Sequence, residues 1–119
     1  MNDARELTKN NDALTFTVAF NYGGRAELVD AFRAMSADNL SPKQITEKKL
    51  KQYLYGKSMP DPDLILRTSG EQRLSNFLLW QSAYSEFLFL DTLWPDFTRE
   101  TLHQAVSEYQ IRSRRFGAL

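Results

Sequence analysis

The chain reads PDPDLILRTSGEQRLSNFLLW over residues 60–80, and this stretch decides the fold class. The apolar run Leu64–Leu66 is typical of a short buried strand, and it ends abruptly at a charged residue, Arg67. Two arginines, a glutamate, two serines, a threonine and a glycine follow within nine residues, before the chain turns apolar again. Groups that bind anions are therefore concentrated at the mouth of a predicted strand.

The segments on either side alternate between strand and helix patterns. Strand patterns cover residues 14–21 (LTFTVAFN) and 86–91 (EFLFLD). Helix patterns cover residues 25–35, a segment from Ser41 or Thr46 to about Tyr55, residues 76–84, and a segment from Thr98 to Gly117. Apolar strands that alternate with helices predict a three-layer α/β fold, with a mostly parallel sheet and flanking helices. We expect parallel strands near residues 14–21, 63–67 and 86–90.

Two of the predicted helices have recognisable signals. Leu28, Phe32 and Met35 follow the i, i+4, i+7 spacing of a buried helix face. Ser75 is placed to cap the helix predicted over residues 76–84. These signals assign core positions and a helix start, which the structure can test.

Composition narrows the class of protein. The chain has 119 residues, enough for one small domain, and 42% of them are hydrophobic. Its 15 basic and 15 acidic residues balance, which argues against non-specific binding of nucleic acid. It has no cysteine, so disulfides and thiolate metal sites are excluded. Its first residues are polar and unlike a signal peptide, and no apolar run is long enough to span a membrane, so we expect a cytoplasmic protein.

The predicted sheet is thin for an α/β domain. Three strands are few for this architecture, and no helix or strand of the sheet precedes the first of them. We therefore interpret residues 1–119 as a single partial domain, the trailing half of a larger α/β domain.

The polar residues after Leu66 form the first candidate site. Ligands of parallel sheets bind outside the carboxyl ends of the strands. Arg67, Arg73 and Ser75 combine two guanidinium groups and a hydroxyl before a predicted helix, which suits a diphosphate. Glu71 is placed to hold the arginines when no ligand is bound. The alternative is a surface cluster of ion pairs around a capped helix.

A second candidate follows the first predicted strand. Two glycines in Asn21–Arg25 (NYGGR) allow close backbone approach, and the start of the next helix favours an anion. The alternative, that the glycines only make a tight turn, is the favoured interpretation of this weak motif.

Four stretches carry a family resemblance: NYGGR, PDPDLILRTSGEQRLSNFLLWQSAYSEFLF, LWPDF and RSRRFG. They resemble the cis-prenyltransferases, the undecaprenyl or decaprenyl diphosphate synthases, over residues 11–117. The resemblance implies a Mg²⁺-dependent transferase that adds isopentenyl diphosphate to an allylic diphosphate such as farnesyl diphosphate. Its product would be a long-chain polyprenyl diphosphate with Z double bonds, a lipid carrier for cell-wall glycans. The resemblance also implies a homodimer, with peripheral membrane association for product release.

The resemblance further implies roles for individual residues. Arg67, Arg73 and Ser75 would grip the diphosphate of isopentenyl diphosphate, with Glu71 shaping that site and Glu71 and Arg73 counted as catalytic. Glu86 would help to organise Mg²⁺; the alternative is an ordinary carboxylate at a strand entry. Arg115 and Gly117 match a C-terminal Arg-x-Gly motif that reaches the partner's substrate site across a dimer.

The front half of the family pattern is absent. The first strand, the Asp-Gly-Asn-Gly-Arg-Trp loop that binds the allylic diphosphate, and the helices of the prenyl tunnel have no counterpart. We therefore expect the chain alone to be inactive, marginally stable and prone to self-association through exposed apolar surface. A non-catalytic partner subunit of a heteromeric cis-prenyltransferase is the alternative. A generic phosphate- or nucleic-acid-binding module is disfavoured by the zero net charge and by the specific match.

Overall fold

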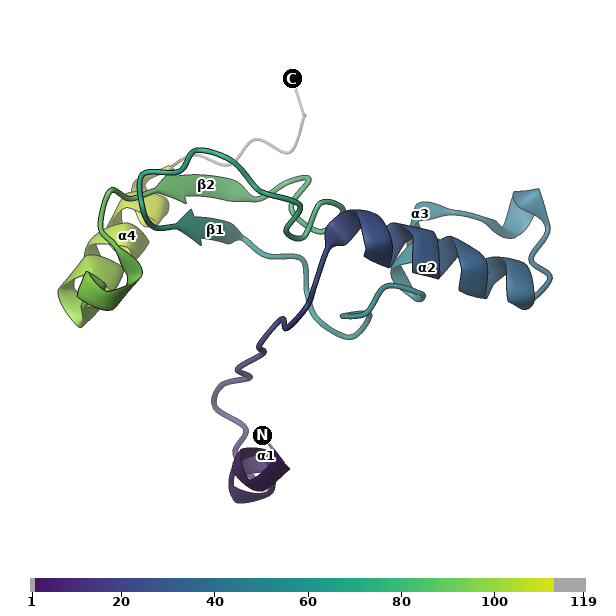
Figure 1. Cartoon of the computed structure of the whole chain (residues 1–119), viewed down its shortest axis with the longest axis horizontal. Helices are drawn as coiled ribbons and strands as arrows, with labels where there is room; N and C mark the ends of the chain where they lie inside the picture. Colours follow the sequence, from purple (N-terminus) through teal and green to yellow (C-terminus); the bar gives the residue numbers. More distant parts are fainter. Residues whose placement is uncertain (1, 113–119) are drawn as a thin grey trace.

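The computed structural model describes residues 2–112. Its elements are, in order, α1 (Asn2–Thr8), α2 (Gly24–Ala37), the 3-10 turn η1 (Pro42–Gln44), α3 (Glu47–Lys51), β1 (Leu64–Arg67), β2 (Glu86–Phe89), the 3-10 turn η2 (Trp94–Asp96) and α4 (Arg99–Ile111). Strands β1 and β2 lie with α4 on one side of the molecule, and α2 lies with α3 on the other (Figure 1). Helix α1 and the segment after it extend away from both groups (Figure 1).

Strands β1 and β2 form a parallel pair, as predicted. Leu64 pairs with Glu86, and Arg67 pairs with Phe89 at the carboxyl end. Ile65 and Leu88 are buried at the centre of the pair. The α/β class and the parallel pairing are therefore confirmed, although the described residues contain two strands and not the three that were expected.

Helix α4 lies against this pair and begins where its capping signal places it. The Thr98 hydroxyl accepts a hydrogen bond from the Thr101 N–H at 3.3 Å, which satisfies one of the free donors at the helix start. Ala105 is buried, and the Arg112 guanidinium donates to the Phe87 carbonyl of β2 at 2.7 Å. The small side chain of Ala105 lets α4 lie close to the sheet, and the Arg112 hydrogen bond attaches the end of the helix to β2.

Helices α2 and α3 share a separate small core of Ala31, Met35, Leu50 and Leu54. Helix α2 covers the predicted residues, and two of the three residues predicted for its inward face are found there. Met35 is buried and Leu28 packs against the core, whereas the side chain of Phe32 is 50% exposed, so that part of the prediction is wrong. The helix also buries Gly24, Glu27 and Ala31, so its inward face is turned away from Phe32. Helix α3 starts after the Thr46 cap but ends at Lys51, earlier than expected.

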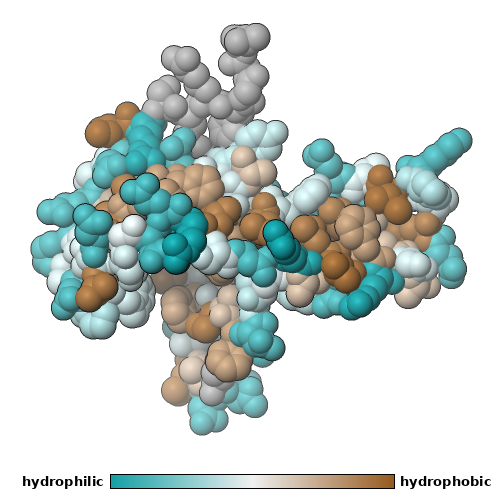
Figure 2. All heavy atoms as spheres, turned by 45° about the horizontal axis from the view of Figure 1, so that its top comes forward, coloured by the Kyte–Doolittle hydropathy of each residue, from teal (hydrophilic) through white to brown (hydrophobic). Residues whose placement is uncertain are grey.

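The strand predicted over residues 14–21 is wrong. Residues 12–20 are irregular, and Leu14, Phe16, Val18 and Phe20 are 82, 85, 58 and 84% exposed. Hydrophobic side chains are visible on this protruding arm in Figure 2. A strand needs a neighbour for its main-chain hydrogen bonds, and no strand among residues 2–112 pairs with this segment.

The helix predicted over residues 76–84 is also wrong, because this segment is a series of turns. Ser75, Asn76 and Leu78 have φ angles of 48, 66 and 44°, which interrupt a right-handed helix. The Ser75 hydroxyl accepts a hydrogen bond from Arg67 and does not act as a helix cap. In the part of the chain that the structure describes, no helix has the length and hydropathy needed to cross a membrane.

Candidate functional site

Arg67 and Ser75 meet at the carboxyl end of β1. The Arg67 Nη1 donates to the Ser75 Oγ at 2.8 Å and also to the main-chain oxygen of Arg73. The loop between them therefore folds back onto the strand end. The guanidinium is held by two neutral oxygens and pairs with no carboxylate within residues 2–112.

Arg73 makes an ion pair with Glu71, two residues earlier in the same loop. The side chains of both residues are partly open to solvent, at 66% and 37% exposure, so this ion pair contributes little to stability. Arg67, Arg73 and Ser75 line one cavity of about 510 Å³, together with apolar residues of β1 and the following turns: Leu64, Ile65, Leu66, Leu74, Phe77 and Leu78, next to Pro62. The structure thus combines a polar end and an apolar wall in one cavity.

The first part of the loop is fixed to the end of β2. The Ser69 N–H donates to the Thr92 carbonyl at 2.9 Å, and the Gly70 N–H donates to the Leu90 carbonyl at 2.8 Å. Gly70 has a φ of 68°, a left-handed conformation that a glycine adopts without strain. The loop therefore leaves β1 along a fixed path before it returns to Arg67.

The NYGGR motif packs against the turns after Ser75. The main-chain N–H groups of Gly24 and Arg25 donate to the carbonyl and the side-chain oxygen of Asn76, at 2.7 and 2.9 Å. These donors at the start of α2 are therefore already used within the chain. The packing alternative is what the geometry supports at this motif, and the anion-binding alternative is not supported.

A buried carboxylate, Glu27, was missed by the sequence analysis. Its side chain accepts hydrogen bonds from the Tyr22 hydroxyl, from the Tyr55 N–H at 2.9 Å and from the Gln81 amide at 3.1 Å. Burial, together with the hydrogen bond to Glu27 and its charge, raises the pKa of Tyr22 well above the ordinary tyrosine value. No spacing of apolar residues marks Glu27, because its partners come from three separate segments.

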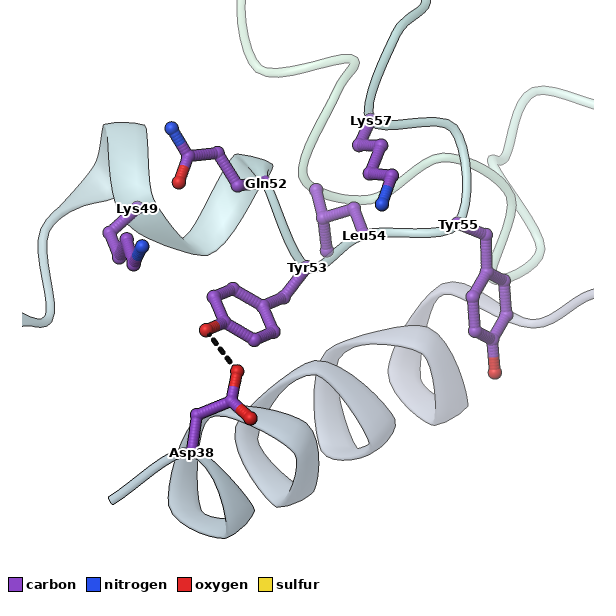
Figure 3. Close-up of a pocket in the computed structure, with 7 residues that line it drawn as sticks. All are labelled: Asp38, Lys49, Gln52, Tyr53, Leu54, Tyr55 and Lys57. Atoms are coloured by element: carbon purple, nitrogen blue, oxygen red, sulfur yellow. Dashed lines mark hydrogen bonds between the residues drawn. The ribbon is translucent and has the colours of Figure 1, made fainter. Parts of the chain in front are cut away.

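A second cavity of about 490 Å³ lies between the end of α2 and the segment after α3 (Figure 3). The Tyr53 hydroxyl donates to Asp38 at 2.6 Å, and this bond raises the pKa of Tyr53 (Figure 3). The ammonium of Lys49 lies 5.6 Å from the centre of the Tyr53 ring. Because none of the predicted site residues lines this cavity, we take the cavity beside Arg67 as the candidate site.

Glu86 lies apart from that cluster. It occupies the first position of β2, whereas Arg67 pairs with Phe89, so about 10 Å of strand separates their main chains. Its carboxylate pairs with Arg112 at 3.3 Å. No group of three or more acidic or histidine side chains is arranged to hold a metal ion in residues 2–112. Arg115 and Gly117 lie outside the described residues.

The parallel strand pair and its flanking helices place the chain among the α/β proteins. The family model described as "Putative undecaprenyl diphosphate synthase" matches residues 1–117. The chain therefore belongs to this family of prenyltransferases.

Named relatives agree with this assignment. A trans,polycis-polyprenyl diphosphate synthase, (2Z,6E)-farnesyl diphosphate specific, of Thermobifida fusca (strain YX) is 55% identical, over 98% of this chain and 43% of that protein. A ditrans,polycis-undecaprenyl-diphosphate synthase, (2E,6E)-farnesyl-diphosphate specific, of Micrococcus luteus is 50% identical, over 98% of this chain and 49% of that protein. The chain thus spans about half the length of the curated relatives that it matches.

Solved structures agree as well. The lavandulyl diphosphate synthase of Lavandula x intermedia, solved with dimethylallyl diphosphate, has a TM-score of 0.92 at 40% identity, covering 98% of this chain and 52% of that one. A probable undecaprenyl diphosphate synthase of Campylobacter jejuni has a TM-score of 0.81 at 36% identity, covering 98% of this chain and 54% of that one. The fold is therefore that of the corresponding half of these enzymes.

Proposed function

We propose that the protein is a cis-prenyltransferase that condenses isopentenyl diphosphate with an allylic diphosphate such as farnesyl diphosphate, giving a long-chain polyprenyl diphosphate. The observation that carries the proposal is the shared cavity of Arg67, Arg73 and Ser75, whose remaining wall is largely apolar. A diphosphate suits the two guanidinium groups and the hydroxyl, and a five-carbon chain suits Phe77, Leu78 and the residues of β1. The names of the relatives support the same class of reaction.

In this proposal the cluster binds and orients the homoallylic substrate. Arg67 exchanges its neutral partners for phosphate oxygens, and Arg73 exchanges Glu71 for the same group. Charged bidentate hydrogen bonds are stronger than those to neutral oxygens, so the exchange at Arg67 favours binding. The oriented substrate then forms a carbon–carbon bond to the allylic carbon as the diphosphate group of the allylic substrate leaves, and the joined product loses a proton.

Magnesium belongs to the proposal as the cofactor, but the described residues do not build its site. When bound, Mg²⁺ would neutralise charge on a leaving diphosphate. Hard cations of this kind require several oxygen ligands, and Glu86 offers one carboxylate that is already paired with Arg112. Further ligands would have to come from outside residues 2–112.

The remaining parts of the proposal concern assembly and location. We place the protein in the cytoplasm as a homodimer, in which Arg115 and Gly117 serve the partner's site, with peripheral membrane contact for release of product. The 119-residue chain alone is inactive in this proposal, because the reaction needs two diphosphates and the described residues offer one cluster for them. Nothing in those residues favours the role of a non-catalytic partner subunit.

Kinetics of Arg73→Ala test the proposal in a catalytically active protein that contains this chain. Losing a charged partner of a diphosphate costs about 2–5 kcal/mol, so KM for isopentenyl diphosphate should rise at least about 30-fold. KM for the allylic substrate should stay near the parent value. An unchanged KM for isopentenyl diphosphate would contradict the site assignment. Product made by the purified 119-residue chain would contradict the proposed inactivity of the chain alone.

A further inference from the structure

Asn76 connects the loop that carries Ser75 to the start of α2. Its partner Arg25 lies 51 residues earlier in the sequence. The main-chain oxygen of Asn76 accepts from the Gly24 N–H at 2.7 Å, and its side-chain Oδ1 accepts from the Arg25 N–H at 2.9 Å. The first N–H groups of a helix have no acceptor within the helix. One residue therefore satisfies two such donors and fixes the loop at a single point.

The glycine pair before Arg25 makes this contact possible. A Cβ atom at Gly23 would lie 2.8 Å from the Asn76 Nδ2. A Cβ atom at Gly24 would lie 2.9 Å from the Leu79 Cγ and 3.1 Å from the Leu79 main-chain nitrogen. A side chain at Gly24 would press on the main chain of residues 76–79, and one at Gly23 would displace the side chain of Asn76, so both glycines serve this docking.

The fixed residue is the direct neighbour of a predicted ligand. The Ser75 Oγ accepts from the Arg67 Nη1 at 2.8 Å, and Ser75 and Asn76 both have left-handed main chains, with φ of 48 and 66°. These unfavourable conformations at two successive residues need contacts that hold them. A displacement of Asn76 would therefore move the Ser75 hydroxyl relative to Arg67.

A second attachment lies five residues further along the same segment. The Gln81 amide donates to both carboxylate oxygens of the buried Glu27, at 3.1 Å each. Glu27 is on the first turn of α2, next to the two N–H groups that Asn76 accepts from. The segment after Ser75 is thus attached to the amino-terminal turn of α2 at two points, Asn76 and Gln81.

We infer that Asn76, docked on Gly23 and Gly24, is a positioning residue that sets the Ser75 hydroxyl opposite Arg67 for a diphosphate ligand. The inference rests on the proposed function, because it deepens the account of the same site. Asn76 touches no reacting atom in this account. It acts through Ser75, and the glycines act through Asn76.

Calorimetric titration of the 119-residue chain with inorganic diphosphate and with isopentenyl diphosphate tests the inference. Asn76→Gly retains the left-handed main chain and the carbonyl bond but removes the Oδ1 acceptor. Gly23→Ala displaces the same contact from the α2 side and leaves Asn76 itself unchanged. Asn39→Gly is the matched control, because it makes the same change at an exposed residue with a φ of 55°, beyond the other end of α2.

We expect Kd for both ligands to rise about tenfold in Asn76→Gly and in Gly23→Ala, the effect of losing one well-placed hydrogen bond. Asn39→Gly should bind like the parent. The double variant Ser75→Ala with Asn76→Gly should bind no more weakly than Ser75→Ala alone, since Asn76 acts through that hydroxyl. Melting temperatures of all variants are measured in parallel.

The outcomes separate the inference from the proposed function. If the parent chain binds neither ligand, the proposed site is wrong and the inference falls with it. If the parent binds and Asn76→Gly and Gly23→Ala bind equally well, the site stands and the positioning role is wrong. Additive losses in the double variant would also overturn the role. If Asn76→Gly does not fold, Gly23→Ala decides by the same criterion.

Discussion

Residues 14–20 and strand β2 are both rich in aliphatic and aromatic side chains, yet only one of them is a strand. In β2, Leu88 is 5% exposed and the main chain pairs with β1. In the other segment, Phe16 is 85% exposed and the chain is irregular. The difference lies in what surrounds each segment, because β1 and α4 cover β2. Strand propensity describes how well a side chain fits a half-buried sheet, and it is not realised without one.

Proline substitutions in the two segments should give the largest difference in stability. Leu88→Pro removes a main-chain donor that lies between the N–H groups of Glu86 and Leu90, which donate to Asp63 and Arg67. It also removes a buried side chain. We expect a loss of about 4 kcal/mol or more in the free energy of unfolding, measured by urea denaturation. Thr17→Pro is the matched control in the exposed segment and should change stability by less than about 0.5 kcal/mol. Equal losses would show that residues 14–20 are packed in solution.

Glu27→Ala tests the attachment of the segment after Ser75 to the first turn of α2. It leaves the Tyr22 hydroxyl, the Tyr55 N–H and the Gln81 amide without their shared acceptor. Buried donors that lose their partners are costly, so we expect a loss of about 3 kcal/mol in thermal or urea unfolding. Glu27→Gln retains one acceptor oxygen and should cost less. A loss below about 1 kcal/mol in Glu27→Ala would contradict the buried position of this carboxylate.

Arg112→Ala tests how α4 is held on the strands. The guanidinium donates to the Phe87 carbonyl at 2.7 Å and pairs with Glu86 and Glu108, at 3.3 and 2.6 Å. These side chains are partly exposed, so we expect a loss of about 1–2 kcal/mol, with faster amide hydrogen exchange in α4. Arg33→Ala, which removes an exposed pair with Asp30, is the control. Unchanged exchange in α4 would rule out this attachment.

Phe16→Ser should have the smallest effect on stability, and it tests the exposed segment directly. Because the ring is exposed, its loss should change the free energy of unfolding by less than about 0.5 kcal/mol. The substitution should instead reduce self-association of the chain, measured by sedimentation velocity, since exposed apolar patches drive association. A clear loss of stability would mean that the ring is buried.

The elements whose signals are local were predicted from the sequence. Strands β1 and β2, helix α2 and the start of α4 carry their own periodicity and capping residues, and the structure contains them. The segments at 14–21 and 76–84 were predicted wrongly, because their conformation depends on neighbours that periodicity does not encode. Asn76 is the clearest case, since its partners are at Gly24 and Arg25.

The residues around the candidate site also include some that were predicted from the sequence and one that was missed. The loop from Arg67 to Ser75 was found from residue types, and the structure places Arg67, Arg73 and Ser75 around one cavity. Glu27 escaped detection because a lone glutamate on a helix is normally exposed. The roles of Arg67, Arg73 and Ser75 as ligands of a diphosphate remain predictions, as does the role of Glu86 in binding a metal.

The central claim is that the cluster at the end of β1 binds a diphosphate, and calorimetric titration of the chain with isopentenyl diphosphate tests it most directly. Arg67→Ala removes the guanidinium that lies on Ser75, and Arg33→Ala removes an exposed arginine of α2 as the control. We predict that Arg67→Ala raises Kd at least about 30-fold, that Arg33→Ala leaves it unchanged, and that isopentenol does not bind measurably. Equal Kd values for the parent and Arg67→Ala would contradict the account.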